Sequence, residues 1–261
     1  MADLAANPVN QFSIGHVLKQ TFSAFFRRIT HFLPLGLLCY LPVGIMNYIQ
    51  NQALVDLKHS SDLAEALVNN SITWMALSFL LPMVCAGVFA AVAIYEVVMD
   101  ETGARPGLGE AIAAAAPRIL PVVLASILFT IIVYAGMILL FIPGLFLLTM
   151  LWVTVPAVVM KGLGPIAALK RSANLTKGYR WRVFGLIVLF IILVFILQWA
   201  LSLVLILATS EIANVYFLTG IGYLGITTFG VLSALAVAYT YVALKIAKEG
   251  ASVEELAAVF D

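Results

Sequence analysis

Charged residues are scarce in this chain. Asp, Glu, Lys and Arg together make up 10% of its 261 residues, whereas a soluble globular domain carries about 25%. Apolar residues account for 63%, and the mean hydropathy is +1.09. A surface of this composition is not stable in water, which excludes a soluble fold. The net charge of +1 gives no basic surface for nucleic acid, so we expect no nucleic-acid partner.

Residues that build catalytic or metal centres are also few. The chain has two cysteines and three histidines. Cys39 and Cys85 lie inside apolar runs, and their spacing matches no metal-binding motif. His16 and His31 are expected on one side of the spans proposed below and His59 on the other. Because these residues cannot meet at one ion, we predict no metal site, no cofactor and no enzyme activity.

The apolar runs are continuous and do not alternate with polar residues as a transmembrane β-strand would. In a helix, about 20 apolar residues cross the hydrocarbon core of about 30 Å. We therefore predict an all-α integral membrane bundle of six transmembrane helices, with amphipathic interfacial helices on the cytoplasmic side. The expected spans are 31–49, 72–98, 119–141, 144–160, 183–208 and 219–246.

The third and fourth spans share one apolar stretch, which is interrupted only by Pro143 and Gly144. The stretch from 119 to 160 is too long for one span and suits two. Proline ends a helix and glycine permits a reversal, so we predict a tight helical hairpin that turns at these two residues. A single kinked helix is the less favoured alternative.

Basic residues gather on one side of these spans. Only Lys58 lies in a segment on the other side. The positive-inside rule then places both termini, including the tail 247–261, in the cytoplasm of a bacterial inner (plasma) membrane. An odd number of spans would break this pattern. The residues on the basic side are Lys19, Arg27, Arg28, Arg105, Arg118, Lys161, Lys170, Arg171, Lys177, Arg180, Arg182, Lys245 and Lys248.

Three of the basic segments lead into a span through a short stretch compatible with a helix, at 13–29, 107–119 and 164–183. The first places apolar residues on one face and basic residues on the other, which is typical of a helix in the headgroup plane. We predict interfacial helices at 13–29 and 164–178. The order of one interfacial helix and two spans then occurs three times, although basic inner loops alone produce a similar pattern.

The segment from Lys161 to Arg182 holds six basic residues and no acidic one. Such clusters attract anionic lipid by about 1 kcal/mol for each charge near the surface. The alternative is that they only set the orientation of the chain, and this simpler explanation is favoured. The candidate contacts to anionic lipid are Lys19, Arg27, Arg28, Lys170, Arg171, Lys177, Arg180 and Arg182.

The middle of the chain, 139–186, carries a resemblance to known proteins. Its elements are Phe141-Ile142-Pro143-Gly144-Leu145-Phe146, Val155-Pro156-Ala157-Val158-Val159, Ala168-Leu169-Lys170-Arg171-Ser172 and Leu175-Thr176-Lys177-Gly178 with Trp181-Arg182. This order resembles a bacterial family of uncharacterised inner-membrane proteins, itself similar to the membrane domain of glycerophosphoryl diester phosphodiesterases. The resemblance implies six spans with interfacial helices. It transfers no catalytic residue, because the catalytic part of those enzymes is a separate soluble domain.

Polar residues inside the spans are rare, and two are candidates for an intramembrane site. Glu96 lies near the inner end of the second span and Gln198 lies in the fifth. Glu96 could bind a proton or cation, but pairing with Arg105 or Arg118 at the interface is the simpler expectation. The glycines of the string 220–225 are expected to permit close helix packing rather than to bind a dinucleotide.

These observations favour a non-enzymatic scaffold or accessory protein that contacts membrane lipids at the cytoplasmic leaflet. Other membrane proteins remain alternative partners, and nothing in the sequence indicates an oligomeric state. The alternative function is a small transporter or a lipid-handling protein with a cavity between the spans. A polar cavity containing Glu96 or Gln198 would favour transport.

Overall fold

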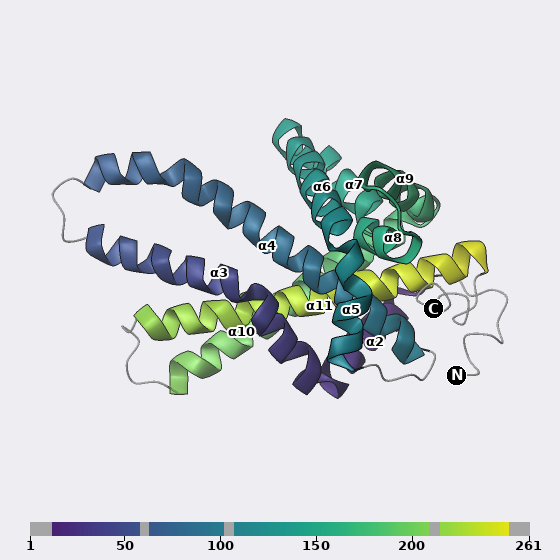
Figure 1. Ribbon diagram of the computed structural model, residues 1–261, viewed down its shortest axis with the longest axis horizontal. Coiled ribbons are helices and arrows are strands. Elements are labelled where there is room, and N and C mark those ends of the chain that lie inside the picture. The colour runs from purple at the N-terminus through teal and green to yellow at the C-terminus, as the bar shows by residue number, and fades with distance from the viewer. Residues whose placement is uncertain (1–11, 58–62, 102–106, 209–214, 251–261) are drawn as a thin grey trace.

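The computed structural model describes residues 12–57, 63–101, 107–208 and 215–250, and every regular element within them is a helix. The long helices are α3 (Ile29–Leu57), α4 (Leu63–Glu101), α6 (Ile119–Leu139), α10 (Arg180–Ala208) and α11 (Val215–Glu249) (Figure 1). The shorter helices are α2 (Ile14–Arg27), α5 (Leu108–Ala115), η1 (Ala116–Arg118), α7 (Phe141–Leu151), α8 (Thr154–Lys161) and α9 (Pro165–Thr176).

Six segments of these helices are long and apolar enough to cross a membrane, so the predicted all-α class with six spans is confirmed. The segments are Ile29–Gln50, Leu80–Asp100, Gly109–Leu139, Phe141–Lys161, Arg180–Ala200 and Gly220–Glu249. Helix α4 begins nine residues before the predicted start of its span, at Leu63. Its 39 residues are about 58 Å long at about 1.5 Å each, which exceeds the hydrocarbon core of about 30 Å.

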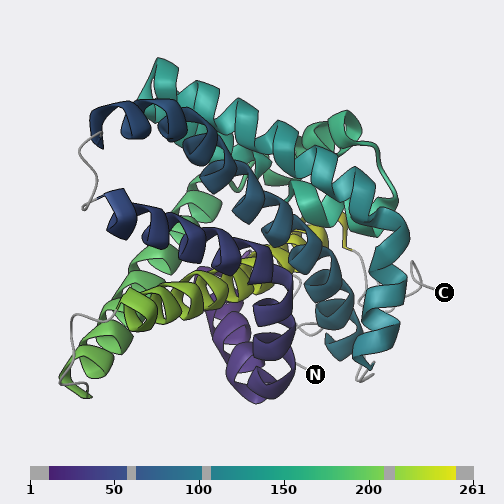
Figure 2. The ribbon, with the colours of Figure 1, turned by 60° about the vertical axis from the view of Figure 1, so that its left-hand side comes forward.

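A short helix precedes each pair of spans. Within the described segments, α2 leads into α3 and α4, α5 leads into α6 and the α7–α8 pair, and α9 leads into α10 and α11. The apolar side of α2 is buried, and it packs against α11 and α10. Figure 2 shows α2 and α3 meeting in an elbow beside α11. The tail after Gly250, and also Lys58 and Arg105, lie outside the described residues.

The reversal between α6 and α7 differs from the prediction. The turn lies at Leu140, which adopts an extended conformation with φ −162° and ψ 129°. Pro143 is in the first turn of α7, where its missing N–H needs no partner. Gly144 lies against Met137, so it permits close packing of the two helices instead of forming the turn. The predicted hairpin is present, but the predicted roles of Pro143 and Gly144 are wrong.

The fourth span is broken. Helix α7 ends at Leu151 and α8 begins at Thr154, with a turn at Trp152 and Val153. Pro156 explains this break, because it cannot donate a hydrogen bond to the carbonyl of Trp152 and its ring would clash with that carbonyl. The predicted continuous span 144–160 is therefore two helices.

The second half of α4 is the centre of the packing. In an 18-residue stretch of its span, 61% of the residues are buried, compared with 28% in the corresponding stretches of the spans of α6 and α10. Helix α4 packs against α3, α6, α8 and α11. By contrast, α10 exposes large apolar side chains, which is typical of a lipid-facing helix. These include Leu189, Ile192, Phe195, Ile196 and Trp199.

Candidate functional site

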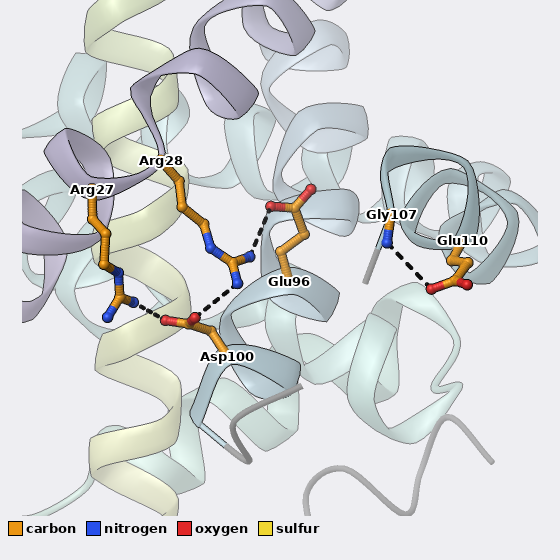
Figure 3. A network of polar contacts seen from close by, with 6 residues as sticks. All are labelled: Arg27, Arg28, Glu96, Asp100, Gly107 and Glu110. Carbon is orange, nitrogen blue, oxygen red and sulfur yellow. Dashed lines mark hydrogen bonds and ion pairs between the residues drawn. The ribbon is translucent and has the colours of Figure 1, made fainter. Parts of the chain in front are cut away.

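The first group of polar residues joins the α2–α3 elbow to the end of α4. We call Arg27, Arg28, Glu96 and Asp100 the elbow cluster (Figure 3). Arg28 follows the last residue of α2, and its Nη2 lies 2.9 Å from Asp100 Oδ1. Its Nη1 lies 3.9 Å from Glu96 Oε2. Arg27 forms a further ion pair with Asp100 and donates a hydrogen bond to it.

Burial differs strongly within the elbow cluster. The side chain of Glu96 is 0% exposed and that of Arg28 is 14% exposed, whereas that of Arg27 is 56% exposed. A buried carboxylate is stable only with a countercharge, and Arg28 supplies it from another helix. Pairing of Glu96 was expected, but with Arg105 or Arg118. The ion pairs of the elbow cluster therefore link the α2–α3 elbow to α4.

A second polar group ties α9 to the end of α11. Arg171 forms an ion pair with Glu249. The Nζ of Lys248 donates to the backbone carbonyls of Asn174 and, over 3.1 Å, of Lys177. Each of the two polar groups links a short helix to a long one. Some of the basic residues therefore pair with carboxylates within the protein.

The eight predicted lipid contacts consequently fall into two sets, five arginines that contact other side chains and three lysines. Among the arginines, Arg27, Arg28 and Arg171 are paired with carboxylates, as described above. The guanidinium of Arg180 lies 4.9 Å from the ring centre of Phe146. That of Arg182 lies 5.9 Å from the ring centre of Tyr179. The other set consists of Lys19, Lys170 and Lys177, whose side chains are exposed. These three remain the best candidates for contact with anionic headgroups.

A cavity of about 480 Å³ lies between the helices of the bundle. All six candidate spans contribute to its wall, which is mostly apolar. Neither Glu96 nor Gln198 lines it, and no charged residue of the described segments does. Glu96 lies in the elbow cluster, and Gln198 lies against Gly225 of α11. The structure thus does not bring the two predicted intramembrane residues together.

The break in the fourth span forms part of the cavity wall, through Leu151, Trp152, Thr154 and Val155. The hydroxyl of Thr154 donates to the carbonyl of Leu151 over 2.6 Å. The Nε1 of Trp152 and, on α6, the Oγ of Ser126 are buried and have no hydrogen-bond partner among the described residues. Both side chains line the cavity.

Helix α9 forms hydrogen bonds to the backbone next to the break in the fourth span. The Oγ of Ser172 donates to the carbonyl of Met150 over 3.0 Å, and the Oγ1 of Thr176 donates to the same carbonyl over 3.2 Å. Both side chains are fully buried. The segment that the sequence marked only as basic thus also has a polar inner face, which stabilises the broken span.

Sequence reasoning missed Ser126, Trp152 and the break between them. One signal was present, because Pro156 lies within the apolar run of the fourth span, where it removes a backbone hydrogen bond of the helix. Of the glycines expected at close contacts, Gly225 lies against Gln198. Outside the string 220–225, Gly230 lies against the hydroxyl end of Tyr40. A Cβ on Gly220 or Gly222 would meet open space, so these two glycines permit no close contact.

The described residues contain no group of three or more His, Cys, Asp or Glu side chains that could hold a metal ion. The fold and the cavity define an all-α multi-pass membrane protein, with six candidate spans around an apolar chamber. The chain belongs to the family described as domain of unknown function (DUF7847), which matches residues 60–247. Neither a curated protein nor a solved structure matches it.

Proposed function

We propose that this protein is a non-enzymatic lipid-binding protein of the bacterial inner membrane, and that the cavity is its binding site. One observation carries this proposal, namely the chamber of about 480 Å³ with contributions from all six candidate spans. Ligand sites are typically about 300–1,000 Å³, mostly apolar, and contain a few polar groups that orient the ligand. The cavity has each of these properties.

The lining of the cavity favours lipid over an ion or a polar solute. Transporters of charged substrates place ionisable groups or partial charges at membrane depth. Here Glu96 is neutralised by Arg28 in the elbow cluster, and the described lining residues are uncharged. An apolar chain can fill such a chamber without losing hydration energy. Lipid handling is therefore the better-supported form of the alternative that we derived from the sequence.

The cavity can be tested with two matched substitutions. Ala86 on α4 lines the cavity, whereas Ala135 on α6 is exposed on the outside of the bundle. We expect Ala86→Phe to occupy part of the cavity and to lower lipid affinity at least about tenfold, which corresponds to about 1.4 kcal/mol. Ala135→Phe adds the same group without entering the cavity and should leave binding unchanged.

The measurement is native mass spectrometry of the purified proteins, with titration of defined lipids into delipidated samples. Circular dichroism before and after heating establishes that both variants are folded. Equal lipid binding by the Ala86→Phe variant and the parent would show that the cavity is not the binding site.

The exposed lysines support a second function, attachment of the cytoplasmic face to anionic lipid. All three are exposed: Lys19 lies on α2, Lys170 lies on α9, and Lys177 directly follows α9. We expect each lysine to contribute about 1 kcal/mol to the preference for anionic headgroups. This function places both termini in the cytoplasm, as the positive-inside rule requires.

Changing Lys19, Lys170 and Lys177 together to Gln should therefore reduce the retention of phosphatidylglycerol during purification, because three positive charges are lost. The same three positions changed to Arg keep the charge and should keep the lipid. Quantitative lipid extraction of the three proteins gives the comparison. Equal retention by the Gln variant and the Arg variant would contradict this role.

A further inference from the structure

We propose that the cavity binds a neutral lipid whose carbonyl oxygens accept hydrogen bonds from Trp152 and from Ser126, beside the break in the fourth span. This inference rests on the proposed lipid-binding function and adds the chemical class of the ligand. It follows from the charge of the cavity wall, from its free donors and from the way the break is held.

The cavity wall excludes a charged group on the buried part of the ligand. Its polar members among the described residues are hydroxyl groups and one indole N–H, with no countercharge for a phosphate, a carboxylate or an amine. A charge moved into such surroundings loses its hydration and gains no partner. The group that enters the cavity is therefore neutral.

Two hydrogen-bonding groups of the wall favour an acceptor on the ligand. The hydroxyl protons of Ser78 and Thr154 are already donated to the carbonyls of Trp74 and Leu151, each over 2.6 Å. The indole N–H of Trp152 can only donate. The hydroxyl of Ser126, a residue that is 4% exposed, can also donate. Both of these groups are buried without a partner among the described residues. They belong to residues that line the cavity, and an oxygen acceptor on the ligand satisfies them after a small rotation of each side chain.

The break makes this arrangement possible at membrane depth. Irregular backbone inside a membrane is tolerated where it is buried in protein or lines a cavity. On one side of the break, Ser172 and Thr176 bind the carbonyl of Met150. On the other side, Trp152 lines the chamber. Side chains of α9 thus satisfy the free carbonyl of Met150. The indole N–H of Trp152 is left for an acceptor on the ligand.

The test compares lipids that differ in one group. Purified full-length protein is titrated with a diacylglycerol, with the dialkyl ether of the same chain length, which lacks the carbonyls, and with an isoprenoid quinone. We expect at least one carbonyl lipid to bind about tenfold more tightly than the ether, and the tighter of the two identifies the source of the carbonyl. Phosphatidylglycerol with the same chains should not displace it from the cavity.

Two variants remove the donors. Trp152→Phe keeps an aromatic ring and loses the N–H, while Ser126→Ala loses only the hydroxyl. We expect each to reduce the preference for the carbonyl lipid about threefold and to leave binding of the ether unchanged. Trp199→Phe, on the exposed side of α10, is the control and should keep the full preference.

The outcomes separate this inference from the proposed function. If the parent binds the carbonyl lipid and the ether equally, and Ala86→Phe abolishes both, the cavity binds lipid but does not recognise a carbonyl. The inference is then wrong and the proposed function stands. If Ala86→Phe changes the binding of no lipid, both are wrong. A preference that survives in Trp152→Phe and in Ser126→Ala overturns the assignment of the donors.

Discussion

Replacing Arg28 by Ala is expected to lower the free energy of unfolding by about 3–5 kcal/mol, because the change leaves a buried carboxylate without its countercharge. Glu96 is 0% exposed in its side chain, and the guanidinium of Arg28 is its ion-pair partner. The same guanidinium lies 2.9 Å from Asp100. The substitution therefore weakens two contacts between the α2–α3 elbow and α4.

Arg27→Ala is the matched control, since Arg27 also pairs with Asp100 but is 56% exposed in its side chain. Exposed ion pairs contribute about 0–1 kcal/mol, so this variant should remain close to the parent. The double variant Arg28→Met with Glu96→Leu removes both buried charges and should recover most of the loss. Denaturant titration in detergent micelles measures all three. Equal losses in Arg28→Ala and Arg27→Ala would show that the burial of Glu96 is not decisive.

Gly144→Ala is expected to destabilise the protein by about 3 kcal/mol, although alanine is the better helix former. A Cβ at this position would lie 2.6 Å from the backbone N of Met137 and 2.7 Å from its Cα. Backbone atoms cannot rotate away as the end of a side chain can. The α6–α7 hairpin must therefore open, and the apolar contact between its helices is lost.

Gly222→Ala provides the control, because nothing lies within 4 Å of a Cβ at that position. This substitution should stabilise α11 by up to about 1 kcal/mol through helix propensity alone. The two glycine variants are thus expected to shift stability in opposite directions in the same denaturant titration. A neutral or positive effect of Gly144→Ala would mean that the hairpin is less tightly packed than described.

Gly144 also shows where prediction from sequence ends. The length of the apolar stretch was sufficient to predict two spans, because a helix of about 20 residues crosses the bilayer core and a longer one does not fit. The position of the turn was not predictable from Pro143 and Gly144. Both residue types fit a turn, and both also fit the first turn of a helix or a close contact. Only the packing of Met137 against Gly144 separates these roles.

The same distinction applies to the charged residues. The one-sided distribution of Lys and Arg predicts an orientation because the rule only counts these residues in the loops beside the spans. Whether a given arginine is available to lipid depends on the elements that pack around it. Arg28 and Arg171 meet Glu96 and Glu249 from distant parts of the chain, while Lys170 remains exposed. No local pattern around these residues contains that information.

The sequence by itself therefore determined the class of the protein, the number of candidate spans and the side on which basic residues gather. These properties follow from hydropathy, helix length and charge, which add up along the chain. The tertiary structure alone decided the partner of Glu96 and the cavity to which all six candidate spans contribute. It also decided the burial of Trp152 and Ser126 in the cavity wall. Such features arise when distant helices pack, and their energies depend on three-dimensional contacts that no single segment encodes.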